Sequence, residues 1–93
     1  MRESAIERAL VRKVNRMGGL ALKFVSPGMD GVPDRILLFC PGRIAFVELK
    51  APGCKLRPLQ VKRKRQLESL GFSVYRVDGT EQIDEVLHAI QSP

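Results

Sequence analysis

The stretch GVPDRILLFCPGRIAFVELK, residues 31–50, decides the fold of this 93-residue chain. It contains two runs of mostly apolar residues, several of them β-branched or aromatic, at 35–40 and 43–49. Runs of this kind predict β-strands, and the Pro41-Gly42 pair between them predicts a tight turn. The stretch therefore predicts a β-hairpin.

The segments before the hairpin predict a helix and a short strand. From 4 to 17, apolar residues recur at the spacing of an amphipathic helix, and Gly18-Gly19 ends the pattern. Residues 21–25 predict a short strand, and 26–33 predict a turn-rich loop because Pro and Gly recur there. The apolar positions of the helix are Ile6, Leu10, Val14 and Met17.

The segments after the hairpin predict a helix, a strand and a final helix. Pro58 suits the first turn of a helix that runs to about Leu70 and is ended by Gly71. Residues 72–77 alternate as a strand, and Thr80 can cap the last helix. The apolar positions of that helix are Ile83, Val86, Leu87 and Ile90.

The predicted order is α-β-β-β-α-β-α, which indicates the α/β fold class. The connection from the hairpin through the second helix is long enough to make the last strand parallel to its predecessor. We therefore expect a mixed central sheet flanked by helices. A chain of this length has room for one core, so residues 1–93 are expected to form a single domain.

Composition narrows the class of protein. No run approaches the roughly 20 apolar residues that span a bilayer, and the charged N-terminal segment does not resemble a secretory signal. We therefore expect a cytosolic protein, in which Cys40 and Cys54 remain thiols. The formal net charge of +6 favours a polyanionic partner, nucleic acid first, although charge alone does not decide this.

Three chemically active residues are predicted to meet at the open end of the hairpin. Asp34 stands directly before the first strand, and Glu48 and Lys50 end the second strand on one face, because neighbouring strand residues face opposite ways. Pairing around the Pro-Gly turn places Asp34 across from roughly Glu48 or Lys50. Any one of the three alone could belong to an ordinary surface salt bridge.

A third acid, Glu7, falls within the apolar stripe of the first helix. A carboxylate that faces a core is costly unless a positive group meets it. A partner Lys or Arg is one explanation. The other is a cation shared with Asp34 and Glu48, which three acids from separate elements favour.

Mg²⁺ or Mn²⁺ would suit this set, because both bind oxygen ligands and need no His or Cys. The only histidine, His88, lies in the last helix and is expected to be structural. Metal held by Asp34 and Glu48 would acidify a water molecule and neutralise a scissile phosphate, while Lys50 would orient the water or stabilise developing charge. The residues thus predict a metal-dependent nuclease.

The motif GVPDR, with FVELK following so that Glu48 comes fourteen residues after Asp34, resembles the PD-(D/E)XK nuclease superfamily. Within it, the chain is similar to stand-alone VRR-NUC domains of the phage and bacterial type. The resemblance covers nearly the whole chain through segments in a fixed order: IERALVRKV with Gly-Gly, SPGMDGVPDRILL, FVELKAPG, LRPLQ, LGF and VDG.

The resemblance implies a restriction-endonuclease-like core and a role for each matching residue. Asp34 and Glu48 would be metal ligands, with the backbone carbonyl of Leu49 as a further ligand. Lys50 would be the catalytic lysine. The set is completed by the helix acid Glu7, a metal ligand directly or through water, and by Gln60, a helix residue that supports the site.

Stand-alone members of the family are similar to Holliday-junction resolvases, so we expect a homodimer that acts on branched DNA, in the cytoplasm of a bacterial or phage-infected cell. Basic side chains would contact phosphates without reading bases. The candidates for these contacts are Lys55, Arg57, Lys62, Arg63 and Arg12.

One rival interpretation is a non-catalytic nucleic-acid-binding module, or a nuclease subunit that needs a partner for activity. The basic composition fits both. The acid cluster argues against pure binding, because carboxylates near phosphate repel it unless a metal ion lies between them.

Overall fold

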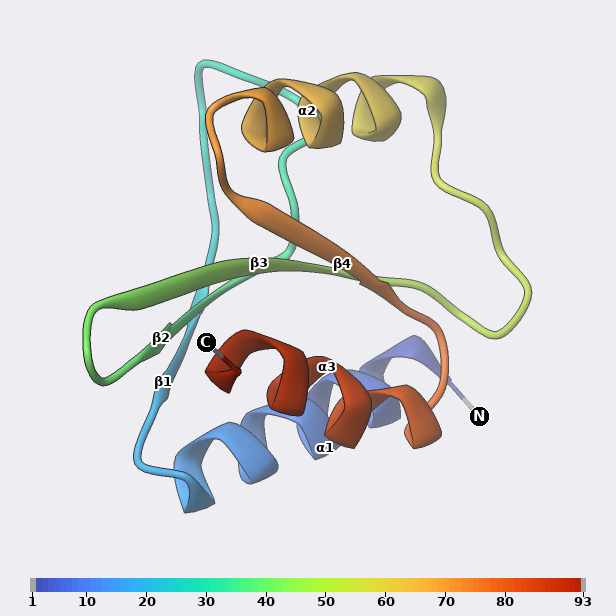
Figure 1. Cartoon of the computed structure of the whole chain (residues 1–93). Coiled ribbons are helices and arrows are strands. Elements are labelled where there is room, and N and C mark those ends of the chain that lie inside the picture. The colour runs from blue at the N-terminus through green and yellow to red at the C-terminus, as the bar shows by residue number, and fades with distance from the viewer. Residues whose placement is uncertain (1, 93) are drawn as a thin grey trace.

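The computed structural model describes residues 2–92 and has the predicted order of elements (Figure 1). Each boundary lies within a few residues of the expected one. The elements are α1 (Glu3–Arg16), β1 (Leu20–Lys23), β2 (Arg35–Phe39), β3 (Arg43–Leu49), α2 (Pro58–Ser69), β4 (Ser73–Val77) and α3 (Glu81–Gln91).

The four strands form one mixed sheet in the order β1-β2-β3-β4. Pairing is antiparallel from β1 to β2 and from β2 to β3, and parallel from β3 to β4. The crossover through α2 therefore makes β4 parallel to β3, as predicted. Helices α1 and α3 lie on one face of the sheet and α2 lies on the other (Figure 1).

The main core lies between the sheet and the α1/α3 layer. Because successive strand residues face opposite ways, the odd-numbered residues of β2 and β3 point into this layer. The core residues are Ile6, Leu10, Val14, Leu37, Phe39, Ala45, Val47, Leu49, Val77, Ile83, Val86, Leu87 and Ile90. Met17 was expected in the helical stripe, but it follows the last residue of α1 and is exposed.

The face under α2 is less completely packed. Phe46 contacts Phe24 in a tilted arrangement and Phe72 edge to face, with the ring centroids of both pairs 5.6 Å apart. Helix α2 itself buries only Gln60, because most of its other positions are polar or charged. Helix α2 is therefore attached to the sheet with little buried apolar surface of its own and with one buried polar residue.

The hairpin register sets the geometry of its open end. Arg35 pairs with Val47 and Phe39 pairs with Arg43 across the turn, where Gly42 has the positive φ of 63°. Continued by one residue, this register places Asp34 beside Glu48, within the range expected from the sequence.

The start of α3 differs from the expectation. The Thr80 side chain makes no capping hydrogen bond, because Thr80 already has helical backbone angles. Instead, Gln82 Oε1 accepts a hydrogen bond of 2.8 Å from the Asp78 N–H. Among residues 2–92, no helix is both long enough and apolar enough to cross a membrane.

We expect Gln82→Ala to destabilise the protein by about 1 kcal/mol, because it leaves the partly buried Asp78 N–H without its acceptor. Thr80→Ala should change the free energy of unfolding by less than about 0.5 kcal/mol. Urea unfolding of both variants measures the difference. A larger loss in Thr80→Ala than in Gln82→Ala would contradict this assignment of the cap.

Candidate active site

Two hydrogen bonds to the backbone of β3 hold Asp34 at the open end of the hairpin. Its N–H donates to the Val47 carbonyl at 3.1 Å, and its Oδ2 accepts a hydrogen bond of 2.7 Å from the Leu49 N–H. These two bonds bracket Glu48 on β3. The Asp34 carboxylate is therefore held beside the backbone that carries the second acid.

Glu48 is a charged residue inside the protein. Only 1% of it is exposed, because β3 is a central strand and α2 covers this face. Its Oε1 accepts a hydrogen bond of 3.1 Å from Gln60 Nε2. Its Oε2 is buried without a hydrogen-bond partner among the described residues. An unsatisfied buried oxygen of this kind is costly and indicates a site that binds something.

The electrostatics of Glu48 follow from its position. Its pKa is raised to about 8, first by burial and then by the negative charge of Asp34, while the positive charges of Lys50 and Arg57 act in the opposite direction. In the metal-free protein, Glu48 is therefore mostly protonated at neutral pH. A cation next to both acids would reverse this balance.

The pair fits a hard divalent metal ion. Asp34 and Glu48 supply carboxylate oxygens, the ligands that Mg²⁺ and Mn²⁺ prefer, and Glu48 Oε2 lacks any other partner. A divalent ion would also offset the repulsion between the two acids. The backbone of Leu49, the further ligand expected from the resemblance, lies against the Asp34 carboxylate.

Lys50 follows β3 directly and is half-buried. Its N–H donates to the Val77 carbonyl at 3.0 Å, which fixes the backbone where β3 ends. Its ammonium group acts on the Glu48 carboxyl but forms no ion pair with it. Lys50 thus lies beside the acid pair with its charge available.

Gln60 connects α2 to the site. Its Oε1 accepts a hydrogen bond of 2.9 Å from the Arg57 N–H, and its Nε2 donates to Glu48. The amide therefore caps the helix and holds the carboxylate at the same time. A cleft of about 560 Å³ opens at this end of α2 and is lined by Asp30, Gly31, Arg57, Pro58, Leu59 and Gln60.

Glu7 does not join this group. Its Oε2 accepts a hydrogen bond of 2.9 Å from Arg35 Nε. Within residues 2–92, no three His, Cys, Asp or Glu side chains are grouped so that they could hold a metal ion. The three-acid cluster is therefore not present, and the other explanation of Glu7, pairing with an arginine, is the arrangement found.

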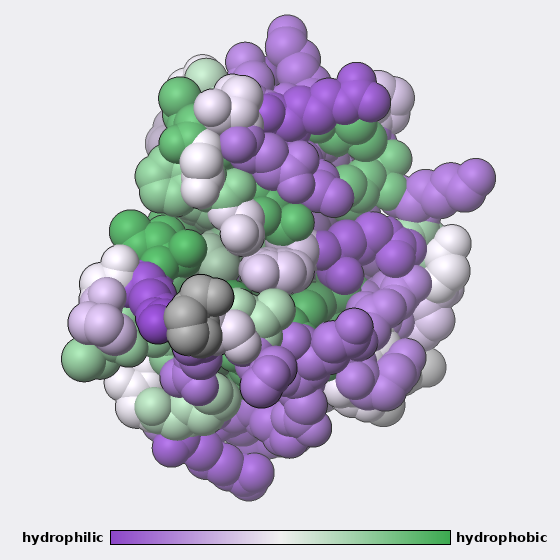
Figure 2. Space-filling model, viewed as in Figure 1, coloured by the Kyte–Doolittle hydropathy of each residue, from purple (hydrophilic) through white to green (hydrophobic). Residues whose placement is uncertain are grey.

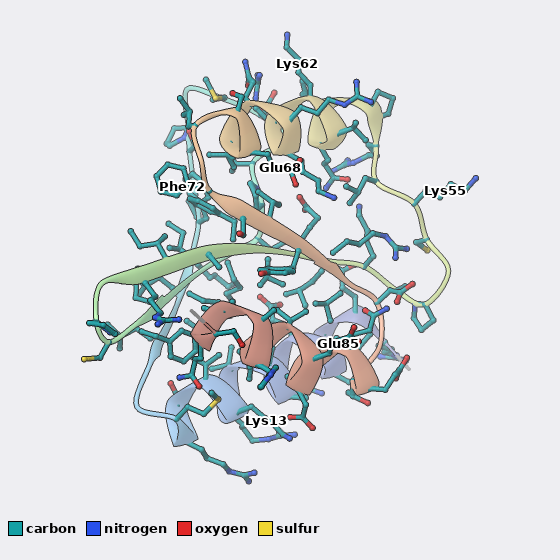
Figure 3. All side chains as sticks on the ribbon, in the orientation of Figure 1. Lys13, Lys55, Lys62, Glu68, Phe72 and Glu85 are labelled. Carbon is teal, nitrogen blue, oxygen red and sulfur yellow. The ribbon has the colours of Figure 1, made fainter. Side chains whose placement is uncertain are left out.

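The basic residues lie in three different settings. Lys55 and Lys62 extend into solvent (Figure 3), and Arg57 is exposed at the start of α2. Arg12 is exposed on α1, across the sheet from α2. Arg63 is held by the loop before Asp34, because its Nε donates to the Asp30 carbonyl at 2.7 Å.

The loop before Asp34 is fixed to α2 by this Arg63 bond and by a close backbone approach. At Gly31, which has a φ of 85°, an added Cβ would lie 2.8 Å from the Leu59 carbonyl oxygen. A side chain at this position would push the loop off the helix. The loop that leads into Asp34 is therefore held on the same helix that supports Glu48.

Sequence reasoning missed Arg76, which pairs in register with Glu48 on the neighbouring strand. Arg76 donates to the Cys54 carbonyl and forms an ion pair of 3.0 Å with Asp78. Asp78 also accepts from the Gly53 N–H, and these interactions lower its pKa. This network fixes the loop that follows Lys50. The alternating strand gave a signal for Arg76, but its partner depends on the parallel register.

Comparison with known proteins identifies a similar curated protein and a similar solved structure. The chain is 44% identical over 90 residues to "Putative nuclease p44" of Acyrthosiphon pisum secondary endosymbiont phage 1, covering 97% of this chain and 96% of that protein. A solved structure described as "VRR_NUC domain" superimposes with a TM-score of 0.87 over 95% of this chain and 97% of its own, at 24% identity. No family model matches the sequence.

The raised pKa of Glu48 predicts how the metal-free protein responds to pH. The folded pKa of about 8 lies above the ordinary 4.5, so the folded state binds this proton more tightly, and stability falls as pH rises from 4.5 to 8. The loss is on the order of a few kcal/mol. Glu48→Gln removes this titration, so in EDTA the variant should gain stability relative to the parent, most of all at pH 9.

Denaturant unfolding at pH 5, 7 and 9 measures this difference. Glu85→Gln is the control, because Glu85 is exposed on α3 (Figure 3) and should follow the parent profile. Parallel profiles for Glu48→Gln and the parent would show that the carboxyl is not perturbed.

Proposed function

This chain belongs to the VRR-NUC nucleases, and we propose that it is a Mg²⁺- or Mn²⁺-dependent endonuclease that hydrolyses phosphodiester bonds in DNA. The observation that carries the proposal is the pair of acids Asp34 and Glu48, of which Glu48 is buried and has one oxygen without a hydrogen-bond partner among the described residues. A divalent cation would bind this oxygen and offset the repulsion between the two ionised acids.

Each residue of the site has a defined task in this reaction. Asp34, Glu48 and the Leu49 carbonyl would hold the metal ion, which when bound acidifies water and offsets the charge of the scissile phosphate. Gln60 orients Glu48 through its amide. Lys50 would orient the attacking water and offset negative charge as the phosphate is attacked.

The substrate would approach along the cleft at the start of α2. Arg57 lines this cleft, and Lys55 lies in the segment that leads into it. Lys62 and Arg63 extend the basic surface along α2, and Arg12 adds charge on the other side of the sheet. These side chains would contact phosphates, so recognition would depend on backbone shape more than on base sequence.

We further propose that the protein acts as a homodimer on branched DNA. An apolar patch on the sheet supports a second copy as partner. Leu20 and Ile44 both pair with Leu38 and so share one face, and they are 56% and 45% exposed. In Figure 2, apolar side chains gather on the left, from the end of α2 down to the hairpin.

Small nucleases have little surface for gripping branched DNA alone, and two copies would present two active sites. Since a relative belongs to a phage, we infer that the reaction takes place in the cytoplasm of a bacterial or phage-infected cell. Burial of this patch would remove exposed leucine and isoleucine side chains from water, which favours association.

A cleavage assay tests the activity. The purified protein is incubated with labelled four-way junction, flap, duplex and single-stranded DNA, each with Mg²⁺, Mn²⁺ or EDTA. We expect cutting only with metal, and a loss of at least roughly a hundredfold in Glu48→Gln and in Lys50→Met. Glu85→Gln and Lys13→Met remove the same charges elsewhere and should cut like the parent.

Binding of DNA without cutting in any metal would contradict the proposal. That result would favour the rival function, a binding module or a subunit that needs a partner.

Sedimentation of Ile44→Asp tests the dimer. A charge in the centre of the patch should give a folded monomer, while the parent sediments as a dimer, because burying an unpaired carboxylate is costly. Met17→Asp is the matched control, since Met17 is a similarly exposed apolar residue outside the patch. A monomeric parent that retains full cleavage activity would overturn the proposed assembly.

A further inference from the structure

The Arg35 side chain connects α1, β1 and β2 through hydrogen bonds, next to the candidate metal site. Its Nε donates to Glu7 Oε2 on α1 at 2.9 Å, and its Nη1 donates to the Ala21 carbonyl on β1 at 2.9 Å. Arg35 itself begins β2 and follows Asp34 in the chain. The side chains of Arg35 and Glu7 are only 15% and 27% exposed.

Glu7 and Glu48 lie on opposite faces of the sheet. Arg35 and Leu37 are two residues apart on β2, so both point to the face that α1 and α3 cover. Glu48 instead contacts Gln60 of α2, which covers the other face (Figure 1). The acid on α1 is therefore separated from the buried acid by the sheet.

The negative charge of Glu7 is already paired with the positive charge of Arg35. If Glu7 moved to a metal ion, the guanidinium of Arg35 would keep only its bond to Ala21 in a mostly buried position, which is costly. The pair is more stable when intact. Glu7 thus has a structural partner that competes with any metal ion for its carboxylate.

We propose that Glu7 is a positioning residue that acts on catalysis through Arg35, and that it is not a ligand of the metal ion. The inference rests on the proposed nuclease function. The Glu7–Arg35 pair fixes the start of β2, and the start of β2 carries Asp34.

The path from the pair to Asp34 runs through the backbone. Glu7 fixes the guanidinium, and the guanidinium holds β1 through the Ala21 carbonyl. Directly after β1, which ends at Lys23, the Phe24 N–H donates to the Asp34 carbonyl at 2.9 Å. Loss of the pair therefore loosens the backbone on which the Asp34 carboxylate is placed.

Conservative and disruptive variants separate a positioning residue from a ligand. Glu7→Gln removes the charge but keeps an oxygen that can accept from Arg35 Nε. Glu7→Ala removes both. Arg35→Gln breaks the pair from the other side, and Arg35→Lys is the milder form if that variant does not fold. Asp34→Asn serves as the reference for loss of a ligand.

Two readouts are measured below the unfolding temperature of every variant. One is the affinity for Mn²⁺ without DNA, from electron paramagnetic resonance. The other is kcat and KM for cleavage. We expect Glu7→Gln to keep Mn²⁺ affinity within about threefold and to lower kcat less than Glu7→Ala does, whereas Asp34→Asn loses Mn²⁺ affinity by at least roughly tenfold.

Glu7→Ala and Arg35→Gln should each lower kcat by roughly tenfold with little change in KM, since small misplacements of reacting groups are costly. The double variant should be no worse than either single variant, because both remove the same interaction.

Three results would overturn the inference. The first is a loss of Mn²⁺ affinity in Glu7→Gln as large as in Asp34→Asn. The second is tighter Mn²⁺ binding in Arg35→Gln, which would show that Arg35 withholds a ligand. The third is unchanged kcat in Glu7→Ala despite a lower unfolding temperature, which would mark a purely structural pair. A parent that neither cuts DNA nor binds Mn²⁺ would instead refute the proposed function.

Discussion

A carboxylate buried in the central strand is the constraint on which the rest of this structure depends. Glu48 lies between β2 and β4 in the sheet and under α2, so water cannot stabilise its charge. The protein compensates only in part, with one hydrogen bond from Gln60 and the nearby charges of Lys50 and Arg57. Gln60, which caps the first turn of α2, and Asp34, which the hairpin places beside β3, both meet at this group.

Much of the fold and half of the site could be predicted because their signals are local. Strand alternation and the Pro-Gly turn place Asp34, Glu48 and Lys50 at one end of the hairpin, and the structure has them there. For these three residues only short-range geometry is needed, and the hairpin supplies it. Gln60 was implied by the family resemblance, and it contacts Glu48 from the first turn of α2.

The side-chain partners that the sequence did not predict depend on packing between segments that are distant in the chain. The partner of Glu7 is set by how α1 crosses β2, which no spacing in the sequence encodes. The sequence therefore favoured a shared metal ion, whereas the partner found is an arginine. The same dependence on packing holds for Arg76, whose neighbour depends on the parallel register, and for Arg63, which the loop before Asp34 engages. Net charge therefore overstates how many basic side chains are free.

The weak apolar anchoring of α2 has a consequence for its dynamics. Gln60 is the only residue that this helix buries, and that residue also holds the acid of the candidate site. Local opening of α2 and disassembly of the site are then one event, because the same amide supports both. We therefore expect α2 to open more readily than the core, and a ligand bound at Glu48 to slow that opening.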